Sequence, residues 1–449
     1  MDRRKLIENP YRPGAGHTPP FLAGRTVEQE HFRRLLRQNF STSNILITGL
    51  RGVGKTVLLE NLRQMAEQEG WIWVGNDLSE SSSLSEERLA LRILTDVSEA
   101  LGRVLAKSEN GQSPAGHHDA GETNSPYAFE VLRNMYERSP GLPSDRLKAT
   151  LVRLGSLVNR AKARGMVFAY DEAQCLSDHA ERNEYPMSLL IETVASLQKR
   201  EGVSQCLLVL SGLPQVFDAL TDTRTYTERM FHVMTLERLS RADTLAAIYN
   251  PLKELMPPLN ASSGLVNKVA DLTGGYPYLI QFFGKELVDH LLRNGGVLHE
   301  DDFPSAEVLD RLDAGLFAAR WNKTTDKQRE VLKVIAKRPD SGSMDFSAQE
   351  ISALSGDIHG LSNPQISQML QTLCERGLLY RSRHGRYAFT VPMSETMILR
   401  RSQSGQDVEA SWHGSVQRTA SSIPAPQAVQ PQPAASSEQK KNTRWGWLR

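Results

Sequence analysis

Nearly continuous apolar runs alternate with helical patterns in the first half of the chain. The runs hold few polar residues, which is typical of parallel strands covered on both faces. The expected strands are 45–47, 71–75, 166–170, 206–210 and 230–236. Between them, apolar residues recur every three or four positions, as along the buried side of a helix. Helices are expected, for example, at 27–38, 84–105 and 144–164. Strands that alternate with helices predict an α/β fold with a doubly wound parallel sheet.

The pattern becomes entirely helical after residue 240. The expected helices are 242–248, 263–272, 278–292 and 305–317. A Thr-Gly-Gly-Tyr-Pro turn at 273–277 separates the second from the third. Several short amphipathic helices in succession predict a small helical bundle.

Residues 323–391 follow another design. Capping boxes at 325–328 and 347–350 begin two helices. A third helix is expected at 364–375, with Asn363 as its N-cap. Two strands, 378–381 and 386–390, then enclose a polar turn. Three helices and a two-stranded hairpin predict a winged-helix domain.

The chain has 449 residues, which is enough for two or three domains. The patterns predict five segments. They are an N-terminal arm at 1–25, a sheet-containing core at 26–238, a helical lid at 239–319, the winged helix at 320–401 and a disordered tail at 402–449. The tail is rich in Ser, Gln, Pro and Ala, and it holds too few apolar residues to build a core.

The stretch from Gly49 to Thr56 has the pattern G-x-x-x-x-G-K-[ST] of a phosphate-binding loop. Its residues are Gly49, Leu50, Arg51, Gly52, Val53, Gly54, Lys55 and Thr56. The glycines let backbone N–H groups surround an anion, and the following helix points its positive end at that anion. Lys55 can reach the β- and γ-phosphates of ATP, while the Thr56 hydroxyl can hold Mg²⁺. The alternative is a glycine-rich turn that fits the pattern by chance, but a strand before it and a helix after it favour the nucleotide site.

Asp171 and Glu172 end the apolar run at 166–170. At the carboxyl edge of a parallel sheet they would lie beside the phosphate-binding loop. Asp171 is predicted to hold Mg²⁺ through water, and Glu172 to polarise the water that attacks ATP. Ser211 ends the run at 206–210 and is a candidate partner of the γ-phosphate or of that water. Its alternative role is to begin the Ser-Gly-Leu-Pro turn.

Composition adds a charge asymmetry. The net charge is +1 overall, but residues 320–401 carry +5 and residues 402–449 carry +2, which leaves −6 for residues 1–319. A basic C-terminal part indicates a nucleic-acid footprint. The three cysteines follow no metal-binding or redox spacing. Neither a signal peptide nor an apolar run long enough for a bilayer is apparent, so the expected location is the cytoplasm, without a membrane partner.

Taken together, these motifs resemble those of the AAA+/STAND branch of P-loop ATPases, close to archaeal origin-recognition-type initiators and their bacterial relatives. The resemblance covers about residues 9–400 and implies an ATPase that uses ATP and Mg²⁺. It gives Ser211 the sensor-1 position, and it places Arg229 where such enzymes hold an arginine that reads the γ-phosphate, in cis or from a neighbouring subunit. Pro277 matches the Gly-x-Pro turn of a STAND lid, near the nucleotide. The segments 9–11 and 24–25 resemble those that line an adenine pocket.

The chain departs from the AAA+ pattern in two respects. Serine replaces the common asparagine at sensor 1, and the lid shows no clear sensor-2 arginine. Both departures indicate slow turnover. For Arg229, a surface or helix-capping role is the alternative.

The winged helix has a candidate DNA-binding surface. Its candidate contacts are Gln365, Gln368, Arg381, Arg383 and Arg386. Glutamine can read base edges from the recognition helix, and a basic wing suits phosphate or minor-groove contact. The alternative is a winged helix that binds protein partners.

The sequence thus predicts an ATP-hydrolysing switch whose nucleotide state controls binding of double-stranded DNA. Self-association that depends on nucleotide is a further expectation. The rival hypothesis is a STAND-type signalling or assembly ATPase whose winged helix and tail hold protein partners.

Overall fold

The computed structural model describes most of the chain. The described residues are 8–14, 16, 18–38, 43–110, 125–199, 205–223, 227–255, 261–293, 298–338, 345–354, 361–383, 385–391 and 393–403. Most of the segment expected to be a tail, 404–449, therefore lies outside the described residues. Within the described residues, no helix is long and apolar enough to cross a membrane.

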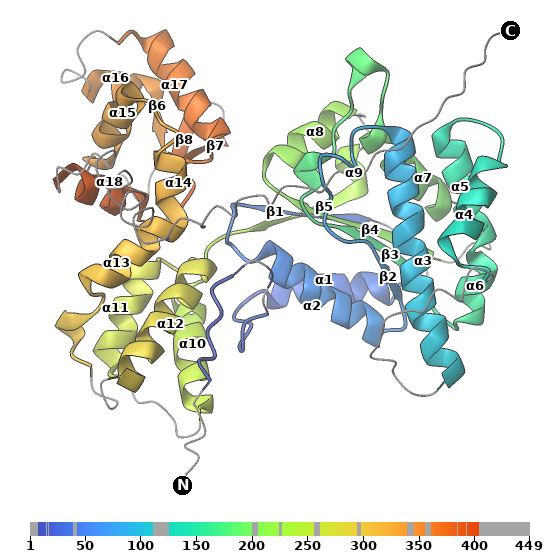
Figure 1. Cartoon of the computed structure of the whole chain (residues 1–449), viewed down its shortest axis with the longest axis horizontal. Helices are drawn as coiled ribbons and strands as arrows, with labels where there is room; N and C mark the ends of the chain where they lie inside the picture. Colours follow the sequence, from blue (N-terminus) through green and yellow to red (C-terminus); the bar gives the residue numbers. More distant parts are fainter. Residues whose placement is uncertain are drawn as a thin grey trace, which may run out of the picture.

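A five-stranded parallel sheet forms the centre of the first lobe (Figure 1). Its strands are β1 (Asn44–Gly49), β2 (Ile72–Val74), β3 (Gly165–Tyr170), β4 (Gln205–Gly212) and β5 (Phe231–Leu236). They lie in the order β2-β3-β4-β1-β5, and every neighbouring pair is parallel. The predicted strands and the parallel sheet are confirmed. The order places β1 between β4 and β5, so the segments after β1, β3 and β4 come out at one edge.

Helices cover both faces of this sheet. They are α1 (Thr26–Leu36), α2 (Lys55–Gln68), α3 (Glu86–Asn110), α4 (Phe129–Glu137), α5 (Pro143–Arg153), α6 (Gly155–Arg160), α7 (Pro186–Gln198), α8 (Gln215–Thr223) and α9 (Thr227–Met230), with short 3₁₀ turns η1 (Ala173–Cys175) and η2 (Ala180–Arg182). Successive strand residues point to opposite faces. Ile45 and Ile47 accordingly pack with α1 and α2, whereas Leu46 packs in the cluster of α3, α5 and α7.

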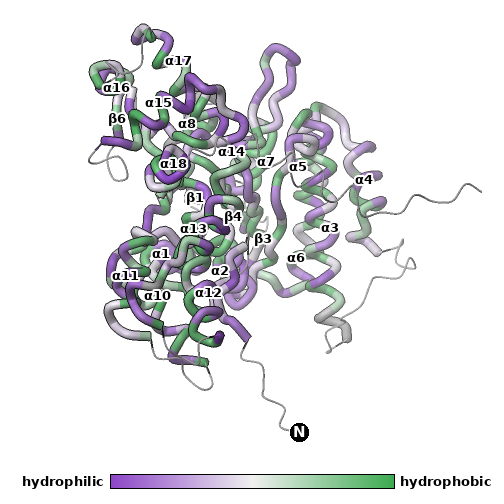
Figure 2. Tube along the Cα trace, turned by 60° about the vertical axis from the view of Figure 1, so that its left-hand side comes forward, coloured by the Kyte–Doolittle hydropathy of each residue, from purple (hydrophilic) through white to green (hydrophobic). Residues whose placement is uncertain are grey.

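Two helical details differ from the sequence-based expectation. The helix expected at 144–164 is divided into α5 and α6, and Gly155, a weak helix former, begins the second piece. No helix was expected at α7. This helix is buried on nearly every side, so its sequence lacks the polar stripe that marks a surface helix. Figure 2 shows that stripe on other helices, such as α3, as bands of polar and apolar residues.

The second lobe begins with the helical lid. The lid helices are α10 (Arg241–Glu254), α11 (Ser263–Thr273) and α12 (Pro277–Arg293). Ser240 and Ser262 cap α10 and α11 with their hydroxyls. A 3₁₀ turn, η3 (Glu300–Asp302), follows. The helix expected at 305–317 is α13 (Ala306–Leu312), which continues through a π-helical segment, η4 (Asp313–Phe317), into α14 (Ala318–Trp321).

The described part of the C-terminal unit, residues 326–403, contains four helices and a small antiparallel sheet. Its elements are α15 (Asp326–Ala336), β6 (Phe346–Ser347), α16 (Ala348–Leu354), α17 (Asn363–Glu375), β7 (Leu379–Arg383), β8 (Arg386–Phe389) and α18 (Ser394–Gln403). The sheet order is β6-β8-β7. The capping boxes at 325–328 and 347–350 are confirmed. The N-cap of α17 is Ser362 and not Asn363 as expected, because Gln365 completes a capping box with Ser362. The helix α18, which packs on α15, was not expected.

One apolar cluster connects the two lobes. It includes the α1–α2 face of the sheet, the lid and the interior of the C-terminal unit. The other face of the sheet has a separate cluster with α3, α5 and α7. The lid and the C-terminal unit are therefore in apolar contact with the α1–α2 side of the first lobe and not with the α3, α5 and α7 side.

Candidate nucleotide-binding site

The glycine-rich loop lies between the end of β1 and the start of α2. Within it, Lys55 Nζ donates hydrogen bonds to the carbonyl oxygens of Gly49 and Leu50, both at 2.9 Å. Burial lowers the pKa of Lys55, and the carboxylates of Asp171 and Glu172 oppose that shift. The ammonium group is thus held at the mouth of the loop, close to two negative charges.

The predicted pair of magnesium-binding residues is brought together at the ends of β3 and of the loop. Thr56 Oγ1 donates to Asp171 Oδ2 at 2.6 Å, and Asp171 is 3% exposed. A hydroxyl beside a carboxylate is a set of hard oxygen donors that fits Mg²⁺. Within the described ranges, no group of three or more His, Cys, Asp or Glu side chains is arranged to hold a metal alone.

Two carboxylates accompany Asp171. Glu172 follows it in the left-handed backbone region, with φ 54°, which non-glycine residues seldom adopt. Asp77 comes from the segment after β2, which pairs with Asp171 by a bridge. Partial desolvation raises the pKa of Asp77, and the charges of Asp171 and Glu172 raise it further. The sequence analysis missed Asp77, because only the sheet order shows that β2 ends next to β3.

Gln174 is a second residue that the sequence analysis missed. Its amide nitrogen donates to Glu172 Oε2, and its amide oxygen accepts from the backbone N–H of Leu213 at 3.0 Å. The sequence shows only that a polar residue stands two positions after the acidic pair. It does not show that this residue contacts Leu213, 39 positions further along the chain.

The structure places Ser211 inside β4 and not at a turn. It is fully buried, its neighbour in β1 is Ile47, and its Oγ has no hydrogen-bond partner among the described residues. A role in beginning the turn is therefore excluded by the strand, which continues to Gly212. Arg229 lies on α9, just before β5, and is exposed.

The Gly-Tyr-Pro turn of the lid contacts the glycine-rich loop directly. The backbone N–H of Tyr278 donates to the carbonyl of Gly52 at 3.2 Å. Gly52 has φ 81°, and a Cβ there would lie 2.9 Å from the ring of Tyr276. Only glycine fits this approach without strain. Pro277 begins α12 directly behind the contact.

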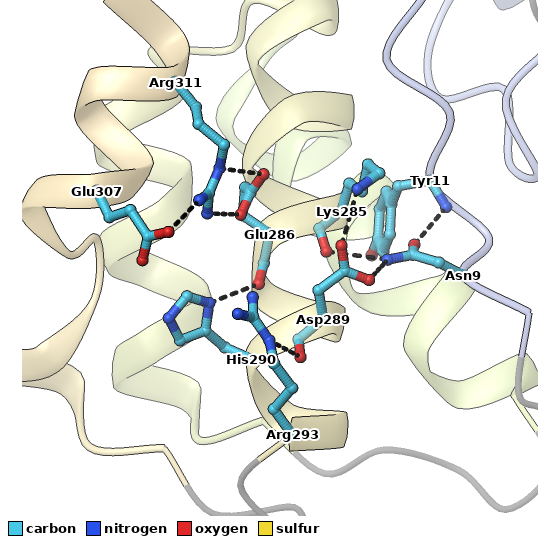
Figure 3. A network of polar contacts seen from close by, with 9 residues as sticks. All are labelled: Asn9, Tyr11, Lys285, Glu286, Asp289, His290, Arg293, Glu307 and Arg311. Carbon is cyan, nitrogen blue, oxygen red and sulfur yellow. Dashed lines mark hydrogen bonds and ion pairs between the residues drawn. The ribbon is translucent and has the colours of Figure 1, made fainter. Parts of the chain in front are cut away.

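The N-terminal arm contacts both the lid and the loop, and Figure 3 shows its contact with the lid. Asn9 donates to the Lys285 carbonyl at 2.9 Å and to Asp289 at 2.7 Å, and the Tyr11 hydroxyl donates to the carbonyl of Ile248. Further along the arm, Arg25 donates to the carbonyls of Val53, in the loop, at 3.1 Å and of Glu237, after β5, at 2.6 Å. The segment 9–11 thus packs on the lid, while Arg25 contacts the loop.

Gly284→Ala is expected to release the arm from the lid. A Cβ at Gly284 would lie 2.5 Å from the ring of Tyr11, which is 2% exposed and whose hydroxyl donates to the carbonyl of Ile248. The arm would have to move, and we expect proteolysis near residue 12 to become faster in limited digestion. Gly315→Ala is the matched control, since nothing lies within 4 Å of its added methyl group. Equal digestion rates for both variants would contradict the expected release of the arm.

The five candidate DNA contacts in the C-terminal unit do not form one free surface. Arg386 pairs with Asp345 at 2.8 Å and Glu350 at 2.5 Å, and Gln365 accepts from the Ser362 N–H at 2.9 Å in its capping box. These two side chains thus take part in the fold of the unit, and their contact with DNA stays a prediction. Gln368 and Arg381 are exposed. Arg383 belongs to β7, and its side chain lies outside the described residues.

Two arginines of α18 form ion pairs with acidic residues of α13 and η4. Arg401 pairs with Asp313 at 2.5 Å, and Arg400 pairs with Asp310 at 2.9 Å. Arg381, in contrast, has its guanidinium over the ring of Tyr387 at 6.0 Å from the centroid. Arg386, Arg400 and Arg401 are thus bound to carboxylates, whereas Arg381 lies over an aromatic ring.

Two protein families match separate parts of the chain. Residues 22–210 match the AAA ATPase domain, and residues 314–398 match a domain of unknown function, DUF8462. Among curated proteins, no sequence matches this chain.

Solved structures with the same fold include two archaeal proteins. The Aeropyrum pernix ORC2 protein in its ADPNP–ADP complexes has a TM-score of 0.53 at 15% identity, over 87% of this chain and 97% of that one. The Walker-type ATPase PABY2304 of Pyrococcus abyssi has a TM-score of 0.52 at 15% identity, over 84% and 96%. At these identities the likeness concerns the fold alone.

The family match begins before the glycine-rich loop and continues through Asp171, Glu172 and β4, the elements that the geometry brings together. Residues 22–210 are therefore an AAA+ P-loop ATPase domain, and the fold of the chain resembles that of origin-recognition-type initiator ATPases.

Proposed function

We propose that the protein is an ATP-binding and ATP-hydrolysing switch whose nucleotide state positions the C-terminal unit. The observation that carries the proposal is a continuous contact from the loop to that unit. Gly52 of the loop contacts the lid turn, and the hydroxyl of Tyr276 in that turn lies 3.5 Å from the carbonyl of Thr390, just after β8. A phosphate that reorders the loop would therefore act on the lid and the C-terminal unit together.

The proposed chemistry uses the residues at the edge of the sheet. Lys55 and the backbone N–H groups of the loop bind the phosphates of ATP, and the Thr56 and Asp171 oxygens hold Mg²⁺, which when bound neutralises phosphate charge. Glu172 accepts the proton of the attacking water. The buried Oγ of Ser211 hydrogen-bonds the γ-phosphate or that water. The similar ORC2 structure was solved with ADPNP and ADP, which supports a nucleotide as the ligand.

The proposal also covers the role of Arg229 and the rate of ATP hydrolysis. Because Arg229 is exposed on α9, it is available to a nucleotide bound by a second copy of the chain, and self-association would then depend on ATP. The serine at sensor 1 and the lack of a clear sensor-2 arginine favour slow turnover.

We further propose that the C-terminal unit is a winged helix that binds double-stranded DNA. The element order α15-β6-α16-α17-β7-β8 supports this, with α17 as the recognition helix and β7-β8 as the wing. Gln368 on α17 and Arg381 on β7 are the exposed candidates for base and phosphate contact.

Duplex binding in three nucleotide states tests this proposal. Filter-binding titrations near 50 mM salt with ATP, ADP and no nucleotide are expected to give three different affinities, and affinity is expected to fall steeply as salt rises. Arg381→Ala should weaken binding, whereas Arg33→Ala, which removes an exposed arginine from α1, should not. Three identical curves at matched salt would exclude control of DNA binding by nucleotide.

The second candidate function is a STAND-type signalling or assembly ATPase that binds protein partners. The ion pairs of Arg386, Arg400 and Arg401 favour it, because these three arginines are already bound to carboxylates. Absence of binding to any duplex near 50 mM salt, with ATP hydrolysis intact, is the result that this alternative predicts.

A further inference from the structure

The side chain of Gln174 joins two elements of the proposed catalytic site. It lies in η1, directly after β3, and its amide nitrogen donates to the carboxylate of Glu172. Its amide oxygen accepts from the N–H of Leu213, directly after β4. Both polar atoms of one amide are therefore used, one for the proposed base and one for the backbone beyond Ser211.

The end of β4 has room for the Gln174 amide because residue 212 is a glycine. A Cβ at Gly212 would lie 2.8 Å from Gln174 Oε1, so a side chain at that position would displace the amide. On the other side, Glu172 has left-handed backbone geometry, and its own N–H donates to Asp171 Oδ1 at 2.9 Å. Among the described residues, no other side chain is recorded as a hydrogen-bond donor to the Glu172 carboxylate.

We infer that Gln174 is a positioning residue that fixes the Glu172 carboxylate relative to the end of β4. This inference rests on the proposed hydrolysis of ATP by Glu172. A carboxylate on a flexible chain must be held to accept a proton from one particular water, and a neutral amide donor holds it without neutralising it. Because the same amide accepts from Leu213, the position of Glu172 depends on the strand that carries Ser211.

Two substitutions separate the two hydrogen bonds. Gln174→Met removes both hydrogen bonds and keeps a side chain of similar length. Gln174→Glu keeps an oxygen that accepts from the N–H of Leu213, but it removes the N–H donor to Glu172. Both variants are expected to lower kcat for ATP hydrolysis about 10-fold or more, as for a lost hydrogen bond to a charged group. The Kd for ATP is expected to stay within about 2-fold, because Gln174 belongs to neither the glycine-rich loop nor the lid. Gln215→Met, an exposed glutamine on α8, is the control.

A purely structural role makes different predictions. If Gln174 only supported the chain after β4, Gln174→Glu would turn over at the wild-type rate, and that result would overturn the inference. In a Glu172→Gln background, Gln174→Met should cause no further loss of single-turnover rate, because the two residues act as one unit. Additive losses would likewise overturn it.

The same measurements distinguish failure of the inference from failure of the proposed function. If Glu172→Gln hydrolyses ATP like the wild type, the assignment of the base is wrong, and the inference fails with it. If Glu172→Gln is inactive while Gln174→Met and Gln174→Glu retain the wild-type kcat, only the role of Gln174 is rejected.

Discussion

Glu172→Gln is expected to bind ATP with near-normal affinity and to lower kcat for its hydrolysis by about 10²- to 10⁴-fold, the usual contribution of a general base. The amide has the shape of the carboxylate but cannot take a proton from water. It still offers an oxygen to the amide of Gln174, so the surrounding hydrogen bonds need not rearrange. Phosphate release and equilibrium binding of a fluorescent ATP analogue would be measured on the same preparation.

Glu181→Gln is the matched control, since Glu181 in η2 is a mainly exposed glutamate on the segment that follows the acidic pair. Its ATPase activity should equal that of the wild type. Turnover of Glu172→Gln at the wild-type rate would show that another group is the base.

Lys55→Ala is expected to weaken ATP binding by about 30-fold or more, which corresponds to about 2 kcal/mol for loss of a charged phosphate contact. Burial already disfavours the ammonium form, and only Gly49 O and Leu50 O accept hydrogen bonds from it in the described residues. A bound phosphate would give this ammonium group a charged hydrogen-bond acceptor in place of carbonyl oxygens. Isothermal titration with ATP and with ADP would measure the change.

Arg63→Ala controls for loss of a cation from the same helix. Arg63 makes only partly exposed ion pairs with Glu60 and Glu67 on the outer side of α2, and such pairs contribute at most about 1 kcal/mol to stability. Its ATP affinity should be unchanged. Equal affinities for Lys55→Ala and the wild type would remove the loop from the nucleotide site.

Local patterns were sufficient to predict the strands, the loop and the acidic pair. The loop follows from eight consecutive residues, and Asp171 follows an apolar run that is visible in the sequence. The loop and Asp171 could also be expected to lie close together, because the carboxyl ends of parallel strands share one edge of the sheet. The structure places Thr56 Oγ1 2.6 Å from Asp171 Oδ2.

Contacts between distant segments could not be predicted in this way. The basic wing looked free because Asp345 and Glu350 are about 40 positions from Arg386 in the sequence, yet both bind it. Gln174 likewise meets Leu213 only because β3 and β4 are neighbours. The helix α7 was missed for a different reason: a helix buried on all sides carries no polar period.

The narrow junction between the two lobes leaves them free to turn as units. Among the described residues, no helix or strand of the sheet lobe packs extensively on a helix or strand of the second lobe. The lobes meet instead through the loop, the lid turn and the N-terminal arm. A small relative rotation would therefore expose little apolar area to water. Any rearrangement transmitted from the loop is accordingly expected to be a hinge rotation of the second lobe, with the packing inside each lobe preserved.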